Sequence, residues 1–187
     1  IGTIGIVDDD TVSLSNLQRQ ILYSTTNLDK SKTKTAKLKL SELNPNTEIK
    51  LFHTKFNKKN GIDILKKFDL VVDCSDNFEA RYDIDYACES LNKPMIYGSI
   101  SKFEGQVSVF HFKDASPYKK LYPEAPVIDQ KDNSRLGVIG VLPGIVGSIQ
   151  ANEVIKIITG IGDTLDNKLL LINTLNLEFQ IINLCNL

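Results

Sequence analysis

Hydrophobic residues follow two spacings along the chain, and these predict alternating strands and helices. Short continuous apolar runs are typical of buried strands, and they occur at 4–7, 49–52, 70–72 and 94–97. Apolar residues three or four positions apart indicate helices, and they occur at 32–43, around 62–68, directly after Asp76 and within 137–162. Strands that alternate with helices predict an α/β fold with a mostly parallel, Rossmann-like sheet flanked by helices.

The second half of the chain adds a different strand pattern. Residues 106–112 alternate between apolar and polar positions, and 169–172 and 177–184 form two strand-like runs around a turn. This pattern predicts antiparallel strands added at the C-terminal side of the sheet. Residues 113–136 show little periodicity and many Pro and Asp residues, which is typical of a lid or a substrate-binding loop.

The apolar segment 137–162 is long enough to suggest a membrane span. Pro143 and the polar group Gln150, Asn152 and Glu153 interrupt it, so a buried helix explains it better. We therefore expect no membrane association and one domain over residues 1–187.

Composition and charge narrow the possible functions. The chain has 187 residues, of which 42% are hydrophobic and 24% charged, with 22 basic and 23 acidic side chains giving a net charge of −1. This balance is typical of a globular domain and argues against broad nucleic-acid binding. Three cysteines with no Cys-x-x-Cys spacing argue against a disulfide framework or a zinc site and favour a reducing cytoplasm.

The beginning of the chain has its own implication. It starts at Ile1 without a methionine and enters the first predicted strand almost at once. We expect that the natural protein begins further upstream and that this chain is a fragment of it.

Asp8 follows the first predicted strand, where open parallel sheets bind their ligands. A carboxylate there can accept a hydrogen bond from a ribose hydroxyl. The simpler alternative is a solvated acid that ends the strand.

The string 15–19, Ser-Asn-Leu-Gln-Arg, gathers polar side chains around one leucine. Arg19 could bind phosphate oxygens with Asn16 in support, since guanidinium groups match phosphate geometry. The alternative is a helix start capped by Ser15, with Arg19 as a surface charge.

Lys32 stands out because it lies four residues before Ala36 on the apolar stripe of the predicted helix. It also lies at the helix N-terminus, where the helix dipole disfavours a cation. Both costs are explained if an anion such as a triphosphate binds there. The neighbouring lysines fall off this stripe and are expected to be solvated.

Asp76 and Asn77 follow another strand that ends in acid, within the string Asp73-Cys74-Ser75-Asp76-Asn77. Asp76 could hold Mg²⁺, which prefers carboxylates combined with phosphate oxygens and water. It could instead only cap the next helix, because Asp76-x-x-Glu79 has the form of a capping box. The two histidines have no partner motif nearby, so we expect neither to be catalytic.

Three strings in order resemble the ThiF/MoeB/HesA family, the bacterial relatives of ubiquitin-activating enzymes. They are residues 7–20 (VDDDTVSLSNLQRQ), 73–77 (DCSDN) and 137–144 (GVIGVLPG). The resemblance implies ATP- and Mg²⁺-dependent adenylylation of the C-terminal glycine of a ubiquitin-like sulfur-carrier protein ending in Gly-Gly, in thiamine or molybdopterin synthesis. It also implies a homodimer, a sulfur donor protein, and a crossover loop at 113–136 that receives the carrier's tail.

The resemblance implies roles for individual residues. Asp8 would hold the ATP ribose, with Asp10 beside it. Ser15, Asn16 and Arg19 would lie at the phosphates, and Lys32 would neutralise charge in the transferring region. Asp76 would serve Mg²⁺ and pyrophosphate, with Asn77 beside it. Arg19, Lys32 and Asp76 are thus the predicted catalytic residues.

The chain also departs from the family pattern. The Gly-x-Gly-Gly-x-Gly phosphate loop and the N-terminal arm with its arginine are missing, so the chain as it stands would not complete an ATP pocket. Where many members have Cys-x-x-Cys, residues 117–120 read Pro-Tyr-Lys-Lys, which leaves no zinc ligands. Asn133-Ser134 replaces the cysteine of some members, so a covalent route through that position is not expected.

Three alternatives remain open. A member of the same family could act on a modified tRNA or on a peptide, although the net charge argues mildly against tRNA. A non-catalytic homologue could keep the fold and serve as a dimerising partner. A nicotinamide-dependent oxidoreductase could use Asp8 for the ribose, but it would leave Lys32 and Asp76 without a task.

Overall fold

The computed structural model describes residues 1–125 and 137–184. They form two compact units, residues 1–56 and residues 57–187, each with its own sheet.

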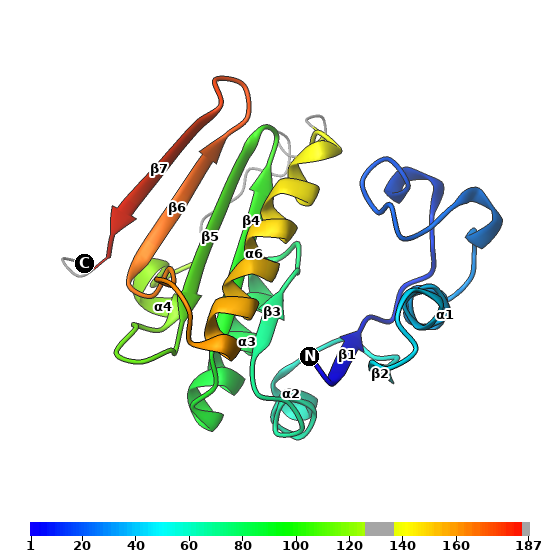
Figure 1. Cartoon of the computed structure of the whole chain (residues 1–187), viewed down its shortest axis with the longest axis horizontal. Coiled ribbons are helices and arrows are strands. Elements are labelled where there is room, and N and C mark those ends of the chain that lie inside the picture. The colour runs from blue at the N-terminus through cyan, green and yellow to red at the C-terminus, as the bar shows by residue number, and fades with distance from the viewer. Residues whose placement is uncertain (126–136, 185–187) are drawn as a thin grey trace. The chain divides into compact units, whose positions relative to one another are not determined.

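The first unit is a small parallel βαβ arrangement. Strand β1 (Thr3–Val7) pairs in parallel with β2 (Glu48–Phe52), and helix α1 (Lys32–Leu43) packs on β2 (Figure 1). Between β1 and α1 the chain makes two 3₁₀ turns, η1 (Leu14–Asn16) and η2 (Thr25–Asn27). The predicted helix over 32–43 is confirmed, because Ser31 caps its first turn and Asn44 ends it ahead of Pro45.

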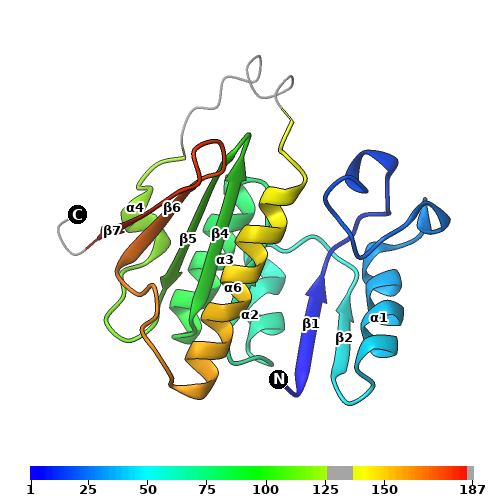
Figure 2. The same ribbon diagram turned by 45° about the horizontal axis from the view of Figure 1, so that its top comes forward.

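The second unit contains a five-stranded sheet in the order β3-β4-β5-β6-β7. Its strands are β3 (Val71–Asp73), β4 (Met95–Ser101), β5 (Glu104–Phe110), β6 (Lys168–Asn173) and β7 (Glu178–Asn183). Its helices are α2 (Lys58–Leu65), α3 (Phe78–Leu91), α4 (Tyr118–Leu121) and α6 (Val141–Thr159). Helix α6 crosses one face of the sheet, and α3 and α4 lie on the other (Figures 1 and 2).

Apolar packing between α6 and the central strands forms the core of this unit. Ile96 of β4 and Val107 and Val109 of β5 are buried against Leu142 and Val146 of α6. Burial of each such side chain stabilises a fold by about 1.5–3 kcal/mol, so this layer fixes the positions of β4 and β5 against α6.

The direction of strand pairing differs in part from the expectation. The predicted α/β character and the C-terminal antiparallel strands are confirmed. Among the described strands, however, β1-β2 and β3-β4 are parallel, whereas β4-β5, β5-β6 and β6-β7 are antiparallel. The expectation of a mostly parallel sheet is therefore wrong for the second unit. Only two residues link β4 to β5, and a connection that short permits only an antiparallel hairpin.

Helix α6 is buried on one face only, which corrects the expectation of a buried helix. By length and composition α6 could cross a membrane, although only 28% of its most apolar 18-residue stretch is buried. Its inner face carries Gln150 and Glu153, which bond backbone groups of the same unit. Its outer face exposes Val141, Ile155 and Ile158. Buried polar side chains with specific partners are what a core helix of a globular unit needs.

The segment expected to be a loop, 113–136, is partly helical where it is described. Helix α4 interrupts it, and Tyr118 at the start of α4 is fully buried. Residues 126–136, including Asn133 and Ser134, lie outside the described residues.

Candidate functional site

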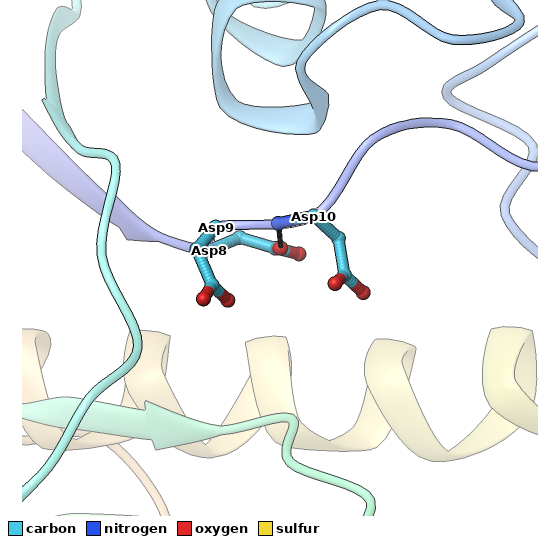
Figure 3. A group of neighbouring side chains, drawn as sticks. All are labelled: Asp8, Asp9 and Asp10. Atoms are coloured by element: carbon cyan, nitrogen blue, oxygen red, sulfur yellow. Dashed lines mark hydrogen bonds between the residues drawn. The ribbon is translucent and has the colours of Figure 1, made fainter.

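Three consecutive carboxylates gather at the carboxyl end of β1. Asp8, Asp9 and Asp10 each place an oxygen within 4.8 Å of the others (Figure 3). The Asp8 carboxylate accepts a hydrogen bond from the Asp10 backbone N–H at 2.8 Å, and the Asp8 N–H donates to the Phe52 carbonyl at 3.2 Å. These bonds hold the chain as it leaves the sheet.

Lys32 brings its ammonium to this cluster. Its Nζ lies 2.7 Å from Asp10 Oδ2 and 3.8 Å from Asp8 Oδ2, and its side chain is 8% exposed. The Lys32 backbone N–H donates to the Asp10 carbonyl, and Tyr23 donates its hydroxyl to the Lys32 carbonyl. Burial, and then the charge of Asp8, raise the pKa of Tyr23, so its hydroxyl remains a donor.

The burial of Lys32 confirms what its helical phase predicts, but the structure supplies a cause that the sequence did not. The carboxylates of Asp8 and Asp10 neutralise the ammonium at the helix N-terminus, so its burial does not by itself require a bound anion. The same carboxylates could offer oxygen ligands to a divalent cation. Lys32 already occupies part of that space.

The stripe on which Lys32 was placed is only partly buried. Ala36 is buried, whereas Leu43 at the end of the stripe is 83% exposed. Thr33 and Thr35 are buried instead, so the buried side chains of α1 are concentrated in its first turns.

Arg19 lies just after the 3₁₀ turn that contains Ser15 and Asn16. Its guanidinium donates to the Ser15 carbonyl at 3.3 Å, and among the described residues it makes no ion pair. The hydroxyl of Ser15 contacts that of Ser13, and no side chain caps this turn. The alternative that Ser15 caps a helix is therefore wrong, and Arg19 keeps donors for an anionic ligand.

In the second unit, Asp76 and Asn77 follow β3 and precede α3. The structure corrects the expected cap: Asn77, not Asp76, caps α3 by accepting the Ala80 N–H at 2.9 Å. Asp76 remains exposed, and its Oδ1 accepts a hydrogen bond from the Asn77 side-chain amide at 3.2 Å. Capping of α3 therefore does not explain Asp76. Its carboxylate is an oxygen ligand of the kind that Mg²⁺ prefers.

Asp73 and Arg81 form a buried pair beside Asp76. Arg81 Nε lies 3.4 Å from Asp73 Oδ2, and neither atom has a hydrogen-bond partner among the described residues. Ser75 donates both its N–H and its hydroxyl to Asp73 Oδ1, and Arg81 donates to the Ser75 carbonyl. Burial raises the pKa of Asp73, while the Ser75 hydrogen bonds and Arg81 oppose that shift.

His111 makes a side-chain contact with Asp85 that the sequence did not predict. Its Nε2 lies 2.6 Å from Asp85 Oδ1, and Asp85 also accepts the backbone N–H groups of Tyr118 and Lys119. Asp85 thus fixes the start of α4. The signal that could have found it is an acid on the apolar face of α3, one position after Ile84.

The structure brings together part of the predicted site. Asp8, Asp10 and Lys32 meet in the first unit, and Ser15, Asn16 and Arg19 lie in the chain between β1 and α1 of that unit. Asp76 and Asn77 are neighbours in the second unit. In both units the predicted residues follow the carboxyl end of a parallel strand, where ligands bind in open α/β sheets.

Comparison with known proteins adds named relatives. The chain is 41% identical over 182 residues to a probable molybdopterin-synthase adenylyltransferase of Porphyra purpurea, covering 96% of this chain and 48% of the relative. It is 39% identical over 186 residues to a sulfur carrier protein adenylyltransferase of Thermus thermophilus, covering 96% of this chain and 69% of the relative. The chain thus spans about half the length of several curated relatives, such as the first.

Solved structures share the fold. The structure of E. coli MccB with ATP superposes with a TM-score of 0.81 at 23% identity, covering 98% of this chain and 57% of that one. PaaA superposes with a TM-score of 0.80 at 21% identity, covering 98% and 57%. At these identities the likeness shows the fold alone.

A family model assigns the chain as a whole. The model of the ThiF family matches residues 1–186. The order of the motifs, the α/β fold and the identity to named relatives agree with this match. The chain belongs to the ThiF family.

Proposed function

We propose that the protein is an ATP-dependent adenylyltransferase that activates the C-terminal glycine of a ubiquitin-like sulfur-carrier protein, of the molybdopterin-synthase type rather than the thiamine type. The names of the relatives support this pathway, since the Porphyra relative is named for molybdopterin synthase and the Thermus relative for a sulfur carrier. In this reaction the carrier's carboxylate attacks the α-phosphorus of ATP. The bond to the β-phosphate breaks, and acyl-adenylate and pyrophosphate form.

The observation that carries the proposal is the buried Lys32 ammonium between Asp8 and Asp10 at the end of β1. A buried ion pair contributes little net stability, because desolvation offsets the Coulomb attraction. The ion pair lies at the carboxyl end of a parallel strand, where ligands bind in open α/β sheets. The Lys32 ammonium could therefore exchange the chain's own carboxylates for a bound triphosphate. Nucleotidyl transfer depends on such positioned charges.

The other residues support the proposal through their hydrogen-bond donors and acceptors. Asp8 would accept from the ribose, with Asp10 holding Lys32 beside it. Arg19 would donate to phosphate oxygens, with Ser15 and Asn16 orienting it.

The metal-binding side of the proposal rests on the second unit. Asp76 would hold Mg²⁺, which supplies charge neutralisation to the pyrophosphate when bound. Asn77 would orient the Asp76 carboxylate through its amide. We further propose a homodimer in the cytoplasm, with a separate sulfur donor protein acting on the adenylate.

The test is pyrophosphate–ATP exchange by the protein at its full natural length. It is run without a carrier, with a molybdopterin-synthase small subunit, and with a thiamine-type carrier, each ending in Gly-Gly. We expect exchange that depends on the molybdopterin-type carrier and on Mg²⁺. Exchange with the thiamine-type carrier alone would contradict the pathway. Absence of exchange with every carrier, from a folded protein, would contradict the activity.

A further inference from the structure

The first unit has an open hollow of about 500 Å³ between the exposed face of α1 and strand β2, which lie side by side (Figure 2). Its lining comes from two leucines, two lysines, a serine and a glutamate: Leu38, Leu51, Lys34, Lys37, Ser41 and Glu42. None of these residues belongs to the candidate site described above. The hollow is therefore a surface feature that the proposed function leaves unexplained.

Leu38 supplies the apolar floor of this hollow. It lies two residues after the buried Ala36, so it points to about the opposite side of the helix. Its side chain is 67% exposed, and the half-buried Leu51 of β2 lines the hollow with it. Single exposed apolar residues are ordinary, but two that line one hollow offer a place to bury a further apolar side chain.

Lysines border the apolar floor. Helix α1 carries four lysines and one glutamate, and the carboxylates of Asp8 and Asp10 face only Lys32. Lys34 and Lys37 form no ion pair among the described residues. The hollow thus combines apolar surface with an excess of positive charge. Its complement is an acidic segment that carries an apolar side chain.

A small molecule and a nucleic acid fit this face less well. One helix and one strand wall the hollow, whereas a ligand pocket encloses most of the surface of a bound small molecule. A nucleic acid would place phosphates at the lysines but leave Leu38 and Leu51 without an apolar partner. An amphipathic peptide helix meets both requirements, because it presents apolar anchors one turn apart beside charged residues.

We propose that the exposed face of α1 is a docking site for an acidic segment of a partner protein. The segment inserts a leucine-sized side chain against Leu38 and Leu51, and its carboxylates pair with Lys34 and Lys37. The aliphatic stems of the two lysines pack along the inserted side chain while their ammonium groups reach the carboxylates. The inference goes beyond the proposed function and does not depend on it.

The test uses the full-length protein and a labelled synthetic peptide as the probe. The peptide is an acidic helix former with two leucines one helical turn apart, and its binding is followed by fluorescence anisotropy. A matched peptide has alanines in place of the leucines. We expect the leucine peptide to bind about tenfold more tightly than the alanine peptide. Its binding should weaken as salt is raised, because salt screens exposed charge pairs.

Single substitutions on α1 locate the binding. Leu38→Ala and Lys37→Glu should each weaken binding of the leucine peptide by about tenfold or more. Lys39→Glu makes the same change of charge on the same helix, but Lys39 does not line the hollow, so binding should stay within about twofold. All three positions are exposed, and circular dichroism checks that each variant is folded. Pyrophosphate–ATP exchange should stay within about twofold in all three.

Several results would overturn the proposal. The first is no binding of the leucine peptide by the wild type. The second is equal weakening by Lys37→Glu and Lys39→Glu, which would show only general charge attraction. If bulk tRNA displaces the peptide and binds Leu38→Ala as tightly as the wild type, the face is a nucleic-acid site instead. If light scattering shows a dimer that Leu38→Ala lacks, a second copy covers the hollow.

Measurements of exchange separate this inference from the proposed function. Reduced exchange in Leu38→Ala with unchanged peptide binding would assign the face to the reaction and overturn the docking site. Absence of exchange in the wild type, with the expected differences in peptide binding, would overturn the proposed function and leave the docking site standing.

Discussion

Lys32 has a structural cause for its burial that is compatible with the proposed phosphate role. Its ammonium is buried because two carboxylates face it, and Asp10, the closer of them, is itself 68% exposed in its side chain. The solvated partner can therefore rotate away when another anion arrives. A lysine paired with a fully buried acid would not have that freedom.

We predict that Lys32→Ala lowers carrier-dependent pyrophosphate–ATP exchange by about 100-fold or more, the effect of removing one preorganised charge from a transfer site. The fold should persist, because Asp10 becomes a solvated acid near a helix N-terminus, where the dipole favours it. Lys39→Ala, on the exposed face of the same helix, is the control. Unchanged exchange in Lys32→Ala would rule out its phosphate role.

Asp76 and Asn77 are adjacent, but their variants should fail in different ways. Asn77→Ala removes the α3 cap and should lower the free energy of unfolding by about 1 kcal/mol. Asp76→Asn keeps that cap, so we expect nearly unchanged thermal stability but strongly reduced Mg²⁺-dependent exchange. Thermal denaturation and exchange at varied Mg²⁺ distinguish the two. A large loss of melting temperature in Asp76→Asn with normal exchange would show that Asp76 is structural.

At the scale of elements, a single carboxylate positions helix α4. Asp85 on α3 accepts from His111 and from two backbone N–H groups at the start of α4. The Tyr118 ring packs among four aromatic rings. Its centroid lies 5.3–5.7 Å from those of Tyr82, Tyr97, Phe110 and Tyr122. A helix as short as α4 has little stability of its own, so these tertiary contacts hold it.

We predict that Asp85→Ala lowers the free energy of unfolding by about 2–4 kcal/mol, because it leaves buried donors without an acceptor. Asp85→Asn retains one acceptor oxygen and should lose less. Urea unfolding monitored by circular dichroism measures both. Equal stability of Asp85→Ala and the wild type would mean that α4 is held by its aromatic contacts alone.

The side chain of Gln150 on helix α6 lies directly against Gly98 of strand β4. A Cβ there would lie 2.4 Å from the carboxamide nitrogen of Gln150, which donates to the carbonyls of Asp73 and Ile96. Gln150 thereby links α6 to β3 and β4 through one side chain. The glycine makes room for that link.

We predict that Gly98→Ala destabilises the protein by about 1–3 kcal/mol, through overpacking and a displaced Gln150. Gly147→Ala is the matched control, since nothing lies within 4 Å of its added Cβ and it sits inside helix α6. The control should be neutral or up to about 1 kcal/mol more stable. Thermal denaturation of both variants tests this, and equal stability of the two would contradict the close approach.

At the scale of the whole molecule, apolar side chains remain on surfaces of the second unit. The outer face of α6 exposes Val141, Ile155 and Ile158, and the edge strand β7 exposes Phe179 and Ile181. Exposed apolar surface of this kind commonly marks contacts with other protein surfaces. The predicted homodimer is consistent with it, and light scattering of the full-length protein tests that prediction by mass.

Local signals predicted much of the fold because their causes are local. Helix α1 was placed at its observed bounds because the helical spacing lies within its own sequence and Asn44-Pro45 follows it directly. The burial of Lys32 followed from the same spacing. The motifs that identify the family are likewise contiguous strings, which is why the resemblance was visible without coordinates.

The features that the sequence predicted wrongly or did not predict depend on contacts between distant residues or on a shift of one position. The cap of α3 falls on Asn77 instead of Asp76, and neighbouring polar residues are equally good caps by sequence. His111 and Asp85 lie 26 residues apart, so no local pattern could pair them. The small pocket lined by Arg81, Gln106 and Tyr122 exists only once α3, β4, β5 and the segment with Tyr122 pack together.

The sequence by itself determined the order of strands and helices, the family, and which residues follow the carboxyl ends of strands. These follow from hydrophobic period, turn chemistry and contiguous motifs, which act over a few residues. The tertiary structure alone decided which carboxylates face Lys32, the contact between Asp85 and His111, and the freedom of Asp76 from capping. Each of these depends on which side chains and backbone groups meet after packing, and the free energy of such contacts is not encoded in any single segment.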